Sequence, residues 1–207
     1  QGAVLVDPES SAEGLFWLLV GGVEDGLGRV AGRQLFALLQ PLAGDGWRKT
    51  SPARLLDFEA PDEPQPLPPG LEQALDGIDQ AVDWSLDHVL DPYLAELQAQ
   101  RQQETGIIRD YLRRSFDVLI ARAQGKLIEY EQKAVQGADM ELSIQEERRH
   151  LEDLRRRQAS RLAENERAAV LSLTAPEVLG VAAVVPSPAR AAAVEAGSGP
   201  AMRRSDA

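Results

Sequence analysis

Residues 104–135, ETGIIRDYLRRSFDVLIARAQGKLIEYEQKAV, form the stretch that decides the fold of this chain. Side chains, most of them apolar, recur every three or four residues, the spacing that places them on one face of an α-helix. This helix exceeds the length at which an isolated helix is marginal, but it still needs a packing partner, because most helical stability in proteins comes from burial of the apolar face. The stripe comprises Ile108, Leu112, Ser115, Leu119, Ala123, Lys126 and Tyr130, and Ile107, Tyr111, Phe116, Ile120 and Leu127 broaden it.

The partner is predicted directly downstream. Gly137-Ala138-Asp139 is typical of a helix end followed by a new start, with Asp139 as the N-cap. A further helix runs from Met140 to about Leu171, and its pairs Glu152–Arg156 and Asp153–Arg157 have the favoured i,i+4 orientation. Because the connection is short, we expect an antiparallel, coiled-coil-like hairpin with Leu151 near Ala123. The apolar stripe of this helix is thinner and includes Met140, Ile144, Leu151, Leu154 and Leu162.

An earlier helix is predicted to start after Gly70. Pro92 removes one backbone donor, so we expect a kink there or a new helix capped by Asp91. The polar segment from Gln98 to Glu104 fits either a solvated helical bridge or a loop. The stripe of this first helix comprises Leu71, Leu75, Ile78, Val82, Leu86, Val89 and Tyr93.

Upstream of residue 60 the pattern changes to that of a small sheet. Apolar runs at 15–20 and 29–40 flank the Gly-rich segment 24–28, which predicts a β-hairpin. Ser51 and Pro52 are typical of a helix N-cap and first residue, and they predict a short helix over 53–58. The side chains expected to pack there are Leu55, Leu56, Phe58 and, on the sheet, Trp47.

The predicted fold class is therefore α+β and mostly α: a small sheet unit, then long antiparallel helices. Prolines between Pro61 and Pro69 predict an extended connector. The composition after Pro186 is rich in Ala, Gly and Ser and predicts a disordered tail. The predicted parts are an α+β unit at 1–60, the connector at 61–70, a helical module at 71–173, a short extended segment at 174–186 and the tail at 187–207.

Composition excludes several function classes. The formal net charge is −11, and residues 1–103 alone carry 17 acidic and 6 basic side chains. That half should repel a phosphate backbone. The absence of cysteine excludes a disulfide framework and a thiol nucleophile. No apolar run is long enough to span a bilayer, so we expect a cytoplasmic protein without membrane contact. The chain begins with Gln1, and we expect a fragment rather than a processed product or a broken reading frame.

Candidate reaction centres are weak. His88 lies near acidic residues, but Trp84 occupies the position where a further metal ligand would be needed. Glu146 and Glu147 fit a charged helix face better than an acid–base pair. Gly26-Leu27-Gly28 lies between two strands and lacks the features of a phosphate or dinucleotide loop. We therefore expect no catalytic, cofactor-binding or metal-binding residue.

Basic side chains on the last helix are the remaining candidate site. They can form a solvent-facing, salt-bridged surface, or they can contact a phosphate backbone or a partner helix. No aromatic side chain is interleaved with them, so a stacking platform for single strands is not expected. The candidate contact residues are Arg148, Arg149, Arg155, Arg156, Arg157 and Arg161.

Several of these segments, in their order along the chain, resemble one family. The chain is similar to the C-terminal accessory region of bacterial superfamily-two, Swi/Snf-related helicase-like proteins, including those of DISARM-type phage-defence systems. The similarity covers nearly all of residues 1–186 and includes none of the motor motifs. It rests on Leu15-Phe16-Trp17-Leu18, Asp25-Gly26-Leu27-Gly28-Arg29, Arg113-Arg114-Ser115-Phe116-Asp117-Val118-Leu119-Ile120, Lys126-Leu127-Ile128-Glu129-Tyr130-Glu131, Glu146-Glu147-Arg148-Arg149-His150-Leu151 and Pro176-Glu177-Val178-Leu179-Gly180-Val181-Ala182.

The resemblance implies a non-catalytic fragment of a DNA-dependent ATPase. Its implied role is an accessory arm that positions nucleic acid or a partner, with the motor lobes of the parent helicase, and DNA, as partners. No cofactor is implied. The alternative is a stand-alone coiled-coil adaptor or self-association module.

Overall fold

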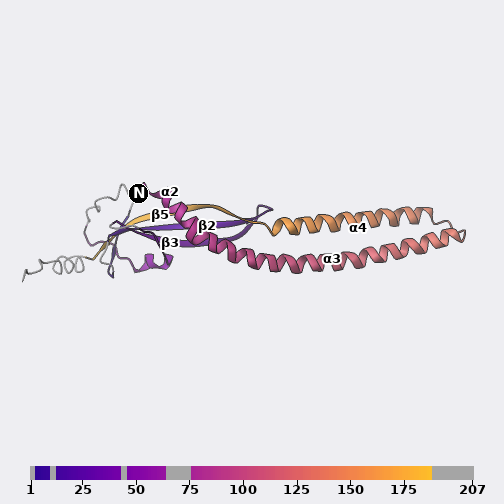
Figure 1. Cartoon of the computed structure of the whole chain (residues 1–207), viewed down its shortest axis with the longest axis horizontal. Coiled ribbons are helices and arrows are strands. Elements are labelled where there is room, and N and C mark those ends of the chain that lie inside the picture. Colours follow the sequence, from indigo (N-terminus) through magenta and orange to yellow (C-terminus); the bar gives the residue numbers. More distant parts are fainter. Residues whose placement is uncertain (1–2, 10–12, 43–45, 64–75, 188–207) are drawn as a thin grey trace, which may run out of the picture. The chain divides into compact units, whose positions relative to one another are not determined.

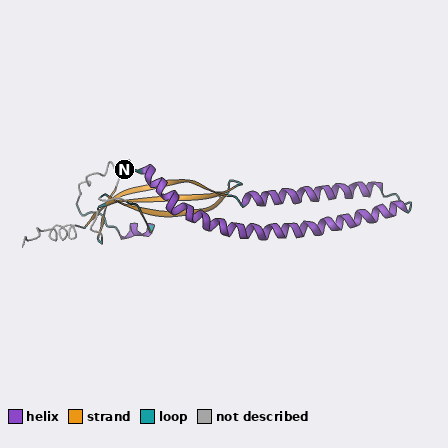
Figure 2. Ribbon diagram, viewed as in Figure 1, coloured by secondary structure: helices purple, strands orange, loops and turns teal. Residues whose placement is uncertain are grey.

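The computed structural model describes residues 3–9, 13–42, 46–63 and 76–187 (Figure 1). It is an α+β fold with a five-stranded sheet and long helices, as predicted (Figure 2). Contacts divide it into two compact units. The sheet unit holds the described residues up to Gly22, then Gly32–Tyr93, and those from Leu173 on; the helical unit holds Val23–Ala31 and Leu94–Ser172. From residue 64 on, the predicted connector at 61–70 lies outside the described residues.

The sheet has the strand order β1-β5-β2-β3-β4. The strands are β1 (Ala3–Asp7), β2 (Gly14–Asp25), β3 (Val30–Pro41), β4 (Arg48–Thr50) and β5 (Leu171–Pro186). β2 and β3 form the predicted hairpin, and β4 pairs antiparallel with β3, with Leu38 opposite Lys49. β1 pairs parallel with β5, with Leu5 opposite Val184.

The strand β5 is the main departure from the prediction in this unit. The segment 174–186, predicted as a short extended segment, is part of the longer strand β5, which lies between β1 and β2. Its residues Ala182–Val185 are buried. A strand with neighbours on both sides satisfies its backbone groups on both edges, which explains how such an apolar run is stabilised.

Large apolar side chains from β2 and β3 form the core of the sheet unit. Trp17, Leu19 and Phe36 are fully or almost fully buried, together with Leu90 from the helical segment that covers this cluster. The Trp17 indole Nε1 donates to Gln40 Oε1 at 3.1 Å. Trp47 packs on Trp17 with ring centroids 5.6 Å apart, as expected for a residue closing the apolar face.

The short helix after Ser51 is a 3-10 helix, η1 (Pro52–Asp57). The Ser51 hydroxyl accepts from the Ala53 N–H at 3.2 Å, which confirms the predicted cap. The packing prediction was wrong for Leu55 and Leu56, which are exposed. Phe58 does pack, edge to face on Phe16 with ring centroids 5.2 Å apart.

Helical structure continues without a break from Ile78 to Val135, through α2 (Ile78–Ser85), the π-helical turn η2 (Leu86–Leu90) and α3 (Asp91–Val135). The polar segment 98–104 is therefore helix rather than loop. Pro92 does not restart the helix. The wide turn just before it, in which the Asp91 N–H bonds to Leu86 O, changes the bonding pattern where Pro92 lacks a donor. The predicted start at Leu71 and the predicted tail beyond residue 187 lie outside the described residues.

In the helical unit α3 and α4 (Glu141–Ala168) run side by side and antiparallel (Figure 1). Ala123, Leu151 and Leu154 are buried together, which confirms the predicted neighbours. Gly137 takes a left-handed φ of 91° and ends α3, as its position predicted. Asp139 is not the cap of α4. The N-cap is Met140, which makes no side-chain bond.

Candidate functional site

All six predicted arginines lie on α4 and are exposed. Four of them are held by carboxylates in the helical unit. Arg148 reaches across to Glu131 of α3 at 2.9 Å, and Arg161 contacts Glu164 at 3.0 Å. Within the described residues, Arg149 and Arg155 make no ion pair.

A single carboxylate, Asp153, binds both Arg156 and Arg157. Arg156 Nη2 lies 2.6 Å from Asp153 Oδ1, and Arg157 contacts Oδ2. Hydrogen bonds from Arg157 and then from Arg156 hold the pKa of Asp153 below its ordinary value. Of the two predicted i,i+4 pairs, Asp153–Arg157 is confirmed. Arg156 pairs with Asp153 instead of Glu152.

The six arginines do not share one face of α4. Each residue turns the helix by about 100°. Arg148 and Arg155, seven residues apart, therefore lie on one flank of α4, while Arg157 and Arg161, four apart, lie on the other. Arg149 and Arg156 point away from α3. The predicted stripe is thus three separate pairs.

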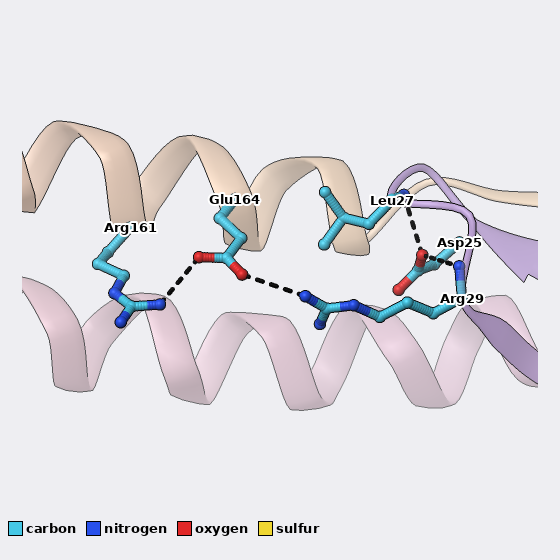
Figure 3. A network of polar contacts seen from close by, with 5 residues as sticks. All are labelled: Asp25, Leu27, Arg29, Arg161 and Glu164. Carbon is cyan, nitrogen blue, oxygen red and sulfur yellow. Dashed lines mark hydrogen bonds and ion pairs between the residues drawn. The ribbon is translucent and has the colours of Figure 1, made fainter.

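The second candidate site is the turn between β2 and β3, which belongs to the helical unit. Asp25 Oδ1 accepts the Leu27 N–H at 2.9 Å and the Arg29 N–H at 3.0 Å, so the carboxylate holds the turn closed (Figure 3). Gly28 supplies the left-handed residue, with φ 74°. The Gly26 N–H donates to Val170 O at 2.8 Å, which fixes the turn to the end of α4.

A row of charges continues from this turn onto α4. Glu164 lies between two guanidinium groups, with Arg161 at 3.0 Å and Arg29 at 3.3 Å (Figure 3). Hydrogen bonding to Arg161 is the largest cause of a lowered pKa at Glu164, and Arg29 adds to it. Because Asp25 lies beside Arg29, the row holds two carboxylates and two guanidinium groups, and their charges are balanced within the chain.

A cavity of about 660 Å³ opens next to this row. Its wall combines apolar groups, including Leu27, Val30 and Ile108, with charged groups. These are the guanidinium groups of Arg29, Arg101 and Arg161 and the carboxylates of Asp25 and Glu164, so the cations outnumber the anions by one. Asn165 also lines it, and its buried Nδ2 donates to Thr105 O at 2.9 Å, joining α4 to α3. These groups suit a contact in which an apolar side chain enters beside a carboxylate or phosphate.

The other sequence candidates are explained by local structure. His88 stacks on Trp84 with ring centroids 4.4 Å apart, and its Nδ1 lies 3.0 Å from Trp84 O. No group of three His, Cys, Asp or Glu side chains that could hold a metal is found among residues 3–9, 13–42, 46–63 and 76–187. Gly26-Leu27-Gly28 is a hairpin turn, as predicted. Among the described helices, none is both long and apolar enough to cross a bilayer.

Two groups in this region were missed by sequence reasoning. Arg29 and Glu164 are 135 residues apart in the chain, and no local pattern connects them. Asn165 carried a weak signal, because an amide inside the apolar register of an amphipathic helix is usually buried with a partner.

Asp25 gives this region a pH dependence. The Arg29 backbone N–H is the largest cause of its lowered pKa, relative to an ordinary value of 3.8. A lowered folded-state pKa stabilises the fold above the unfolded pKa, and this contribution is lost as the pH falls through the folded value. Asp25→Asn should therefore cost about 1 kcal/mol at neutral pH and less in acid. Denaturant unfolding of both proteins at about pH 7 and pH 3 measures this, and an equal difference at both values would contradict it.

The chain matches no model of a known protein family, and its comparison with curated proteins and with solved structures gives no significant similarity. The helicase resemblance stays a prediction, and the function has to be argued from the geometry of the helical unit.

Proposed function

We propose that this chain is a non-catalytic accessory arm of a cytoplasmic, helicase-like, DNA-dependent ATPase, and that its helical hairpin holds nucleic acid or a partner protein against the motor. The proposal joins the family resemblance to one observation, the exposed surface of the hairpin. α3 and α4 meet through a narrow seam at Ala123, Leu151 and Leu154, and many charged side chains are exposed on the two flanks of this seam. A pair of helices of this kind has a large exposed surface for contacts and only a small buried core.

One flank of the hairpin is the best supported place for a phosphate backbone. Ile108 and Arg161 line the same cavity, which puts them on the same side of the hairpin. Lys126 is eighteen residues after Ile108, five full turns, so it lies on that side too. Two further arginines lie on the same side: Arg122 is one turn before Lys126, and Arg157 is one turn before Arg161. We call Arg122, Lys126, Arg157 and Arg161 the basic flank.

The opposite flank is a natural control. Arg148 contacts Glu131 there. Arg113 precedes Glu131 by eighteen residues, and Arg155 follows Arg148 by seven, so these arginines share that flank. Glu131 lies about 140° around α3 from Ile108. Two cations on each flank make no ion pair within the part of the chain that the structure describes: Arg122 and Lys126 on the basic flank, Arg113 and Arg155 on the opposite one. The basic flank is favoured because it carries four basic side chains, whereas the opposite flank carries three beside Glu131.

The test compares two triple variants that remove the same charge. Arg122→Ala/Lys126→Ala/Arg157→Ala should weaken binding to double-stranded DNA and lower the slope of log K against log salt by about three. Arg113→Ala/Arg148→Ala/Arg155→Ala should bind nearly as the parent does. Fluorescence anisotropy over a salt series measures both.

Folding should be almost unchanged in either variant, because exposed ion pairs contribute about 0–1 kcal/mol. If both variants lose affinity equally, the assignment of DNA to the basic flank fails. If the parent chain does not bind DNA, the nucleic-acid role fails. A partner-protein role would then be the only form of the arm left to test.

A further inference from the structure

α3 carries a second apolar stripe on its outer surface. Ile107, Tyr111, Val118 and Ile128 are 65%, 71%, 51% and 55% exposed, high values for large apolar side chains. Their positions alternate in steps of four and three, the heptad spacing of a helix that pairs with another helix. The outer stripe comprises Ile107, Tyr111, Arg114, Val118, Ala121, Gly125, Ile128 and Gln132, all of them exposed.

This stripe faces away from α4. Ala123 belongs to the buried seam between the two helices. Gly125, two residues later, lies about 200° around α3 from it, and so does Val118 relative to Phe116, which packs on the same seam. α3 therefore has apolar residues on two opposite faces, and α4 can cover only one of them.

We propose that the outer stripe is the contact surface of a homodimer, in which α3 of one copy pairs antiparallel with α3 of a second copy. The two-fold axis passes between Val118 and Ala121. Such an interface is isologous, so each contact occurs twice. The layers that result pair Val118 with Ala121, Arg114 with Gly125, Tyr111 with Ile128, and Ile107 with Gln132.

The pairing of Arg114 with Gly125 is the reason to expect a second copy of this chain as the partner of the outer stripe. Arg114 is the one charged residue of the stripe, and Gly125 is its one residue without a side chain. A Cβ built on Gly125 meets nothing within 4 Å, so packing inside the chain does not require glycine there. Glycine inside a helix is unfavourable relative to alanine. A long Arg114 side chain from a second copy, lying across Gly125, gives the glycine a role.

Arg114 and Gly125 also argue against a parallel dimer. It would stack Arg114 on Arg114, two like charges in one layer, and leave Gly125 facing Gly125 with no side chain to fill the layer. The antiparallel arrangement brings Asp110 and Glu131 onto the same side, offset by about two residues, or about 3 Å along the helices. Both carboxylates already have arginine partners, Arg109 at 3.4 Å and Arg148 at 2.9 Å.

The dimer does not depend on the proposed DNA-binding role, because the outer stripe contains none of the four residues of the basic flank. Each inference can fail alone. Loss of DNA binding in a dimeric chain counts against the first only, and a monomeric chain that binds DNA counts against the second only.

The first test is the oligomeric state of the 207-residue chain by sedimentation equilibrium. The parent should be a dimer, and Val118→Glu should be monomeric because it places two carboxylates at the centre of the interface. Leu142→Glu introduces the same charge at an exposed position of α4 and should remain dimeric. Circular dichroism checks that both variants keep their helices. A monomeric parent up to millimolar concentration, or a Val118→Glu variant that still dimerises, overturns the proposal.

The second test fixes the orientation and uses the absence of native cysteine. Arg114→Cys mixed with Gly125→Cys should give a disulfide-linked heterodimer under mild oxidation. Arg114→Cys alone should not cross-link, because the antiparallel register separates the two Arg114 positions by about 16 Å along the helices, beyond the reach of a disulfide. Efficient cross-linking of Arg114→Cys alone, or none in the mixture, overturns the antiparallel dimer.

Discussion

Leu151→Ala should lower the free energy of unfolding of the helical unit by about 2–4 kcal/mol. Leu151 is 8% exposed and belongs to the small cluster with Ala123 and Leu154 that joins α3 to α4. Because few side chains make up this seam, its neighbours cannot fill the cavity that truncation of Leu151 leaves. The loss should appear first as opening of the hairpin, since long helices depend on tertiary packing for most of their stability.

Leu142→Ala is the matched control. Leu142 lies on the same helix and loses the same atoms, but it is 69% exposed, so its effect should stay within about 0.5 kcal/mol. Denaturant unfolding and hydrogen exchange of α3 and α4 distinguish the two variants. Equal effects would mean that the seam at Leu151 does not hold the hairpin together. A cysteine pair at Ala123 and Leu151 should also cross-link within one molecule.

The helical hairpin could be predicted because its signals are local. The three-and-four spacing of apolar residues requires helix, and Gly137 supplies the left-handed residue that ends α3. The same reasoning aligned Ala123 with Leu151 by counting residues from the turn. It was wrong about Asp139, because a cap depends on the backbone angles of one residue, and these are set by how the turn closes.

The position of β5 could not be predicted, because it depends on contacts far apart in the chain. The register that puts Leu5 opposite Val184 joins two segments at opposite ends of the described sequence. Nothing within residues 174–186 states which strands will be its neighbours. Pro92 shows a similar limit. A π-helical turn over Leu86–Leu90 let the helix continue, and sequence spacing gives no sign of that wider turn.

The candidate site was predictable in part. Helical periodicity alone separates the six arginines into three pairs, so the idea of one stripe could have been rejected from the sequence. The partners of those arginines could not be foreseen. Asp153 forms ion pairs with two arginines, and Glu164 forms one with Arg29, which lies in a turn 135 residues earlier in the chain. Only the folded chain shows which charges remain available.

Gly26→Ala should destabilise the helical unit by about 1–3 kcal/mol through overpacking. A Cβ built on Gly26 would lie 2.5 Å from the Arg167 carbonyl oxygen, a backbone atom that cannot turn aside as a side chain can. The Gly26 N–H also donates to Val170 O at 2.8 Å. Any shift that relieves the clash therefore weakens the bond that fixes the β2–β3 turn to the end of α4.

Gly106→Ala makes the same chemical change with the opposite expected sign. Gly106 lies inside α3, and a Cβ built on it meets nothing within 4 Å. Alanine is the better helix former, so this variant should be more stable than the parent by up to about 1 kcal/mol. Thermal and denaturant unfolding of the two variants, measured side by side, give the comparison. A Gly26→Ala protein as stable as the parent would show that the turn is not held against Arg167 and Val170, and the charge row from Arg29 to Arg161 would lose the anchor that positions it.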